Sequence, residues 1–157
     1  MPKFKPNHLV LILLCGSLCT FGCRRKERPQ QITRVAENQI EKVRFQQIFL
    51  SFKEIDPTQK RSKAEAKILA EKLFLDLQKK PSDFPDMVRQ YSDDSFPAVY
   101  TLVNYGQTLA EGDRERDDFP PSVGLRVFEL KLGEVALIPY DKVSSPAGYH
   151  LLIRLPL

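Results

Sequence analysis

Cysteine is scarce in this sequence: the chain has three, at positions 15, 19 and 23, and none after Cys23. Secreted proteins that depend on disulfides spread their cysteines through the fold, so this chain is not a disulfide scaffold. Histidine is scarce too, since only His8 and His150 occur. A zinc site would lack ligands, and we expect neither a metal nor a dedicated cofactor. The adjacent acids Asp93 and Asp94 are interpreted as solvated side chains rather than as metal ligands.

Concentrated basic charge and nucleotide-binding motifs are also missing. The formal net charge is +4, and Lys3 and Lys5 lie in an N-terminal segment that we expect to be removed. The remainder carries roughly +2, too little for the basic face of a nucleic-acid-binding protein. Neither a G-x-x-x-x-G-K-[ST] loop nor a G-x-S-x-G motif occurs. These absences argue against nucleic-acid binding, P-loop chemistry and α/β-hydrolase chemistry.

The N-terminal segment has the pattern of an export signal. Residues 1–8 hold two lysines and no acid, and an apolar run of 13 residues, LVLILLCGSLCTF, follows. A helix needs about 20 apolar residues to span a bilayer, so this run is typical of a signal peptide rather than of a membrane span. His8 lies between the two parts and is interpreted as a signal-peptide residue.

Cys23 lies where the apolar run gives way to a basic, polar segment. The arrangement resembles the lipobox of bacterial lipoproteins, in which cleavage occurs before a cysteine that becomes the acylated first residue. Thr20 stands where leucine is usual. The alternative is an ordinary signal peptide cut near Gly22, which leaves a free cysteine. We expect a lipoprotein-type signal peptide over 1–22 and a membrane anchor at Cys23.

Residues 23–42 are expected to form the anchor and a flexible linker. The segment RRKERPQQITRVAENQIEK is polar and charged, with few large apolar residues, which is typical of linkers. Its basic cluster at 24–26 would be drawn to anionic lipid, or is simply a solvated part of the linker. The predicted location is the cell envelope, on the periplasmic or surface side of a membrane.

Residues 43–157 alternate between strand and helix patterns. VRFQQIFLSF is β-branched and aromatic on both faces, as buried strands are. Ser62 and Glu65 have capping-box spacing, and Pro81 ends the helix that follows. The charge-dense segment 108–119 is interpreted as an exposed loop. We expect an α+β domain of order β-α-α-β-α-β-β with a small four-stranded antiparallel or mixed sheet. Strands are expected at 43–52, 98–105, 135–139 and 148–155, and helices between Ser62 and Pro81, at 83–91 and at 121–130.

Two polar residues interrupt the apolar strands: Gln47 in the first and His150 in the last. A buried amide or imidazole without a partner costs about 1–3 kcal/mol. The two side chains would be neighbours if the first and last strands pair in the sheet. The alternative for a lone histidine is a core residue whose hydrogen bonds are satisfied elsewhere.

Four segments together resemble the parvulins, a family of small peptidyl-prolyl cis–trans isomerases. They occur in the family's order and cover the predicted domain from about 43 to 155. The resemblance implies a parvulin-like fold and rotamase activity. The segments are VRFQQIFLSF as the first strand, DFPDMVRQYSDDS as the D-F-x-x-x-x-x-x-Y-S-D-D-S segment, FELKLGEVALI as the F-x-L-x-x-G-E-V segment, and GYHLLIRL as the closing strand.

The resemblance also implies which residues form the site. The family usually has a hydrogen-bonded pair of histidines beneath its site. His150 matches the second histidine, whereas Gln47 replaces the first. Asp94 falls where the family has a cysteine or an aspartate beside the substrate carbonyl. The family's apolar proline pocket aligns with Leu102, Tyr105, Phe119 and Val123.

Several positions depart from the family pattern. Phe119 stands where methionine is usual, Val123 where phenylalanine is usual, and Val103 replaces a glycine. The loop after Gln107 is longer than is typical. Valine at 123 is smaller than phenylalanine, so the pocket offers less apolar surface to a proline ring. Each CH₂ group that is no longer buried loses about 0.8 kcal/mol of binding free energy, which indicates weaker selection for proline.

Two functions stay open at this point. The first is an isomerase that assists the folding of exported, proline-containing polypeptides at the cell envelope. The second is a parvulin-fold chaperone or peptide-binding module with weak or no isomerase activity. Asp94 and His150 favour the first function, whereas the changes at Gln47 and Val123 favour the second.

Overall fold

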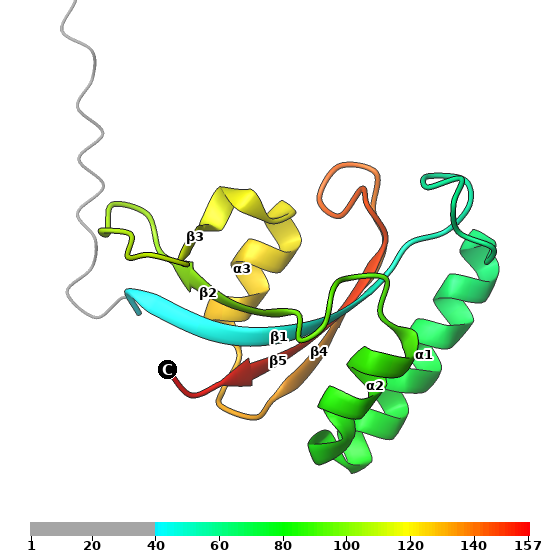
Figure 1. Cartoon of the computed structure of the whole chain (residues 1–157), viewed down its shortest axis with the longest axis horizontal. Helices are drawn as coiled ribbons and strands as arrows, with labels where there is room; N and C mark the ends of the chain where they lie inside the picture. Colours follow the sequence, from blue (N-terminus) through cyan, green and yellow to red (C-terminus); the bar gives the residue numbers. More distant parts are fainter. Residues whose placement is uncertain (1–39) are drawn as a thin grey trace, which may run out of the picture. The chain divides into compact units, whose positions relative to one another are not determined.

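The structure is a computed structural model that describes residues 40–157 (Figure 1). The expected signal peptide, Cys23 and nearly all of the predicted linker lie outside the described residues. Within residues 40–157, the helices and the long strands follow the predicted order, and the α+β class is confirmed. The strands are β1 (Lys42–Leu50), β2 (Val99–Val103), β3 (Arg114–Glu115), β4 (Val135–Ile138) and β5 (Tyr149–Leu155), and the helices are α1 (Lys63–Lys79), α2 (Phe84–Tyr91) and α3 (Pro121–Glu129).

The strands of the described part form one mixed sheet in the order β3-β2-β1-β5-β4. β1 lies at the centre, antiparallel to β2 on one side and to β5 on the other. β4 is antiparallel to β5, and β3 is parallel to β2. The register places Phe49 opposite His150. The first and last predicted strands therefore pair, as the hypothesis about Gln47 and His150 required.

The sheet has a hydrophobic core on each face, and β1 contributes to both. α1 and α2 cover one face, where Ile48 and Leu50 pack in a cluster with Leu73 of α1. α3 covers the other face, where Phe45 packs in a cluster with Val127 (Figure 1). Burial on both sides explains why β1 shows no regular alternation of polar and apolar residues.

Helix α1 begins and ends where the sequence predicts. The hydroxyl of Ser62 accepts a hydrogen bond from the backbone N–H of Glu65, and the Glu65 carboxylate accepts one from the N–H of Ser62. The capping box is therefore confirmed. Pro81 opens a single 3₁₀ turn, η1 (Pro81–Asp83), which leads directly into α2. α2 begins at Phe84, one residue after the predicted start at 83, and the side chain of Asp83 makes no capping hydrogen bond.

The segment 108–119, predicted to be an exposed loop, contains two short elements. β3 extends the sheet beside β2, and a 3₁₀ turn, η2 (Arg116–Asp118), leads towards α3. The ion pair between Lys42 and Asp113, at 2.6 Å, ties this segment to β1. Within residues 40–157 the sheet therefore has five strands instead of the four expected. A strand of two charged residues has no apolar alternation from which to predict it.

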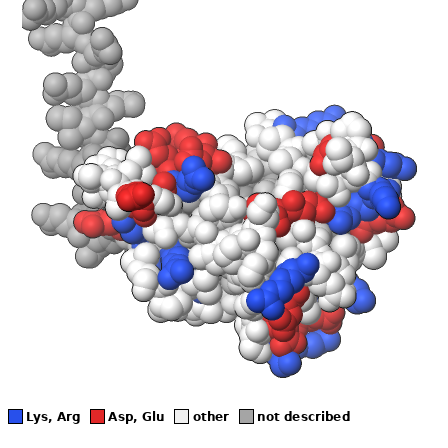
Figure 2. Space-filling view, viewed as in Figure 1, with Lys and Arg blue, Asp and Glu red and all other residues white. Residues whose placement is uncertain are grey.

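The surface of the described part is mixed in charge. On the face shown in Figure 2, acidic and basic side chains are interspersed, without a large area of either sign. Among residues 40–157, none of the helices has the length and apolar character needed to cross a membrane.

Candidate functional site

Gln47, Asp94 and His150 lie in one chain of hydrogen bonds. The side-chain oxygen of Gln47 lies 3.2 Å from Nδ1 of His150, and Nε2 of Gln47 donates to Oδ2 of Asp94 at 2.6 Å. Because an amide oxygen can only accept, Nδ1 of His150 carries the proton. The structure thus brings together all three polar residues predicted from the sequence.

The carboxylate of Asp94 accepts hydrogen bonds from three directions. Besides Gln47, Oδ2 accepts from the hydroxyl of Tyr100 at 2.7 Å, and Oδ1 accepts from the backbone N–H of Ser95 at 2.8 Å. Hydrogen bonds to a charged acceptor are stronger than neutral ones and hold its orientation. Asp94 is only partly buried, so this oriented carboxylate can still face a bound ligand.

The loop at 92–98, which carries Asp94, is tied to β1. The hydroxyl of Ser92 accepts from the backbone N–H of Phe49 at 3.0 Å. Nε2 of Gln46 donates to the carbonyl of Pro97 at 2.8 Å. These contacts fix the position of the loop, and with it the distance between Asp94 and Gln47.

Asp93 anchors the same loop from the other side. Its backbone N–H donates to the carbonyl of Phe49 at 2.8 Å, and its carboxylate accepts from the N–H of Ser51 at 2.8 Å. Arg61 completes the arrangement with an ion pair to the same oxygen at 2.5 Å. The interpretation of Asp93 and Asp94 as solvated acids is therefore wrong: both carboxylates are bonded to named partners.

His150 is a buried, neutral imidazole. It is 3% exposed, and burial lowers its pKa to about 4, although the charge of Asp94 acts in the opposite direction. The ring of Phe49 packs against it, with centroids 4.9 Å apart. Within the described residues, Nε2 of His150 has no hydrogen-bond partner. A proton-transfer group needs a pKa near the working pH, so this imidazole is suited to holding Gln47 in place.

The four apolar residues aligned with the proline pocket do not all lie together. Leu102 and Val123 are fully buried, at 0% exposed, in the core under α3. Phe119 is partly buried and packs on that core. Its ring centroid lies 5.3 Å from that of Phe45 and 5.0 Å from that of Tyr100. Tyr100, which donates to Asp94, therefore connects the acid to the aromatic rings of Phe119 and Phe45, and Phe119 packs on the core cluster that contains Leu102 and Val123.

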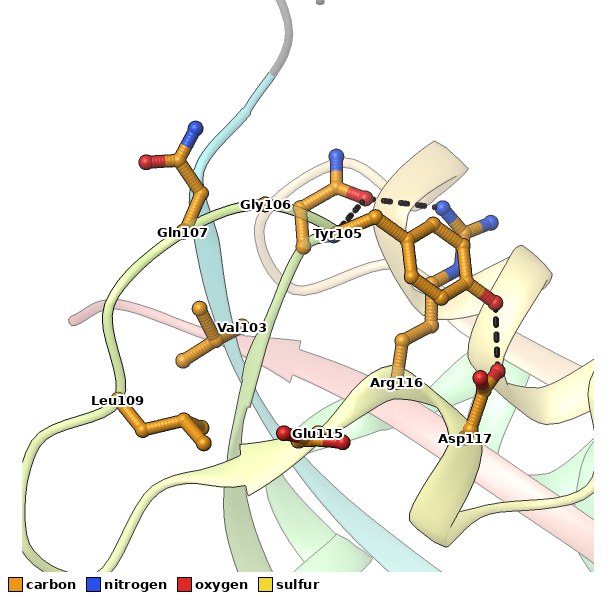
Figure 3. Close-up of a pocket in the computed structure, with 9 residues that line it drawn as sticks. Val103, Tyr105, Gly106, Gln107, Leu109, Glu115, Arg116 and Asp117 are labelled. Carbon is orange, nitrogen blue, oxygen red and sulfur yellow. Dashed lines mark hydrogen bonds between the residues drawn. The ribbon is translucent and has the colours of Figure 1, made fainter. Parts of the chain in front are cut away.

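Tyr105 lines a separate cavity of about 120 Å³ between the end of β2 and η2 (Figure 3). Its hydroxyl donates to Asp117 at 2.6 Å, and the guanidinium of Arg116 lies 5.2 Å from its ring. Tyr105 is 57% exposed. The structure does not bring it together with Leu102 and Val123, because its polar contacts hold it in the long loop after β2.

The comparison with protein families agrees with this geometry. The family model of the PPIC-type PPIASE domain matches residues 30–153. The chain belongs to this family, the parvulin-type peptidyl-prolyl cis–trans isomerases. No curated protein matches the sequence significantly.

Tyr100 and Phe45 lie at this site although the family resemblance assigned neither of them to it. Both are ordinary aromatic residues of strands, and the alternation of β2 places Tyr100 on the same face as Leu102. That alternation is the one signal in the sequence that places Tyr100 near the residues aligned with the proline pocket. The contact between Tyr100 and Asp94 depends on how the loop at 92–98 returns to the sheet, which strand periodicity does not report.

Proposed function

We propose that this peptidyl-prolyl isomerase assists the folding of exported proteins at a membrane surface, where an acylated Cys23 anchors it. Family membership supplies the reaction class. The basic start, the 13-residue apolar run and Cys23 supply the argument for export and anchoring. A flexible linker of the length of 24–42 has a root-mean-square reach of about 25 Å, enough to hold the domain clear of lipid headgroups.

The reaction is a rotation about the amide bond that precedes proline. The barrier is about 18–20 kcal/mol because resonance across the amide must be lost, and X-Pro bonds exchange over roughly 10–100 s without a catalyst. No covalent bond is made or broken. A catalyst therefore needs to bind the twisted amide more tightly than the planar one.

The hydrogen-bonded chain from His150 through Gln47 to Asp94 is the observation that carries the assignment of the site. In the proposed complex Asp94 lies beside the substrate carbonyl, where its charge disfavours the charge-separated planar form. Gln47 and His150 hold Asp94 in this position. Phe119 provides the surface for the proline ring, and the reaction requires no cofactor.

The burial of Leu102 and Val123 favours a second candidate function. With both at 0% exposed, a proline ring would rest on Phe119 instead of entering a deep pocket, and less apolar area would be buried. Such a surface suits a chaperone that binds extended polypeptides through several weak contacts, with slow isomerisation. Unfolded exported proteins would be the partners in either case.

Isomerisation of a short X-Pro peptide by the full chain tests the site. We expect Asp94→Asn to lower kcat/KM by at least about tenfold, the rate equivalent of one electrostatic contact. Asp86→Asn is the matched control, because Asp86 is an exposed carboxylate on α2. Equal rates for the wild type and Asp94→Asn would refute the assignment. A wild type that binds unfolded protein without accelerating isomerisation would support the chaperone instead.

Labelling with a radioactive fatty acid in a bacterial host tests the anchor. We expect label on the wild type and on Cys19→Ser, and none on Cys23→Ser. Cys19 is the control because it lies inside the apolar run that cleavage removes. Label that persists on Cys23→Ser, or a wild type without label, would contradict membrane anchoring at this residue and leave the isomerase assignment untouched.

A further inference from the structure

We propose that Tyr100 is a positioning residue of the isomerase site, whose hydroxyl fixes the carboxylate of Asp94 while its ring fixes Phe119. The inference rests on the proposed roles of Asp94 and Phe119 in that site. It assigns a function to a residue of β2 that no sequence motif marks.

The hydroxyl of Tyr100 forms a specific contact with Asp94. It donates to Oδ2 at 2.7 Å, and the same oxygen accepts from Gln47 at 2.6 Å. Gln47 belongs to β1 and Tyr100 to β2, so two neighbouring strands hold one carboxylate oxygen. Removal of either donor would free the carboxylate to rotate towards solvent, since Asp94 is only partly buried.

Tyr100 keeps its proton under all ordinary conditions. Burial raises its pKa to about 12, and the hydrogen bond to Asp94 contributes to the same rise. The hydroxyl is therefore a permanent donor that does not itself exchange protons with a substrate. Its effect on the reaction has to pass through Asp94.

The ring of Tyr100 links the acid to the aromatic surface. It makes an edge-to-face contact with Phe119 at 5.0 Å and a tilted contact with Phe45 at 5.7 Å. Aromatic pairs in this range contribute about 0.5–1.5 kcal/mol beyond the area they bury. One side chain thus sets the separation between the charge and the apolar surface, which are the two parts that a substrate would contact.

Tyr100→Phe tests the hydroxyl because it keeps the ring. We expect kcat on an X-Pro peptide to fall roughly tenfold, the rate equivalent of one charge-assisted hydrogen bond, with KM nearly unchanged. Tyr140→Phe is the matched control: Tyr140 is a partly buried tyrosine that packs on Phe52 in the core under α1. Tyr100→Leu should also raise KM, because Phe119 loses its neighbour.

A double mutant distinguishes positioning from a general structural role. If Tyr100 acts through Asp94, Tyr100→Phe should cost no further activity in an Asp94→Asn background, whereas a structural defect would lower activity in both backgrounds. Full activity of Tyr100→Phe beside an active wild type would overturn the inference and leave the site assignment intact. An inactive wild type would instead overturn the proposed function, and this inference with it.

Discussion

The side-chain oxygen of Gln47 lies 3.2 Å from Nδ1 of His150, although 103 residues separate the two in the chain. An amide does not titrate, whereas the histidine that parvulins usually have at this place can. In this pair only His150 can change its charge, and its low pKa delays that change until acidic pH. The substitution therefore keeps the hydrogen bond and removes one of the two titrating groups.

Gln47→Leu should destabilise the domain by about 2–4 kcal/mol. The variant leaves Nδ1–H of His150 unpaired inside the protein and removes one donor from Asp94, and each such loss costs about 1–3 kcal/mol. Unfolding in urea, followed by circular dichroism, measures the change. Gln90→Leu is the control because Gln90 is exposed on α2. Equal stabilities for the two variants would mean that the buried chain of hydrogen bonds contributes nothing to stability.

Acid should destabilise the folded protein through His150. Its folded pKa of about 4 lies below the usual value of 6.5, so the unfolded chain binds more protons between these values. The free energy of unfolding should therefore be unaffected by this residue above about pH 6.5 and fall as the pH drops towards 4. The loss approaches about 3 kcal/mol, at 1.36 kcal/mol per pKa unit.

His150→Gln isolates this effect, because carboxylates also titrate in the same range. Denaturant unfolding of both proteins at pH 7 and at pH 4.5 gives two differences. The wild type should lose more stability than the variant between the two pH values. Parallel pH curves would show that His150 does not carry the effect.

Gly148→Ala should destabilise the domain by about 3 kcal/mol or more, since strain and overpacking act together. Gly148 has a φ of +155°, and a Cβ placed there would overlap the carbonyl oxygen of Leu50. The clash falls where β5 begins to pair with β1, next to His150. Thermal unfolding should show the lower stability of the variant, and the isomerase assay should show lower activity.

Gly133→Ala is the comparison for Gly148→Ala. Gly133 has a φ of +74°, and a Cβ added there would have no neighbouring atom within 4 Å. The variant should cost only the conformational penalty, about 1–2 kcal/mol, and leave activity unchanged. A Gly148→Ala variant as stable as Gly133→Ala would contradict the close approach of the two strands.

Arg61→Ala should lower stability by about 2 kcal/mol, since it leaves the carboxylate of Asp93 without its cation in a partly buried site. Because Asp93 anchors the loop that carries Asp94, activity should fall too. Lys67→Ala is the control, since its ion pair with Glu71 is exposed and long, at 3.8 Å, and such pairs contribute little. Faster amide hydrogen exchange at Ser51 in Arg61→Ala would locate the effect. Unchanged exchange there would contradict the anchoring role of Asp93.

The helices and the four longer strands of residues 40–157 were predictable because their signals are local. The capping box at Ser62 and Glu65 and the helix-ending Pro81 set the limits of α1 within a residue or two. The polar interruptions at Gln47 and His150 predicted a long-range contact, because a buried polar group needs a partner. These inferences depend on chemical properties of individual residues, such as the ability to cap a helix, to end one, or to require a hydrogen-bond partner when buried.

The other features of the fold and the site depend on how helices, strands and loops pack against each other, which local sequence patterns do not predict. Gly124 lies inside α3, where glycine is unfavourable, yet the helix forms, and a Cβ there would lie 2.9 Å from the carbonyl oxygen of Arg116. Close packing of α3 against η2 therefore explains this glycine. In the same way, the burial of Leu102 and Val123 and the role of Tyr100 follow from the path of the loops, not from periodicity.

The central position of β5 has a consequence for how this molecule becomes active. β5 is the last strand of the domain, yet it lies between β1 and β4. β1 can therefore pair with β5 only after a segment about a hundred residues further along the chain has joined the sheet. Such high contact order slows folding. The site therefore assembles only once the last strand of the domain is in place, so a chain that lacks β5 would have no active centre.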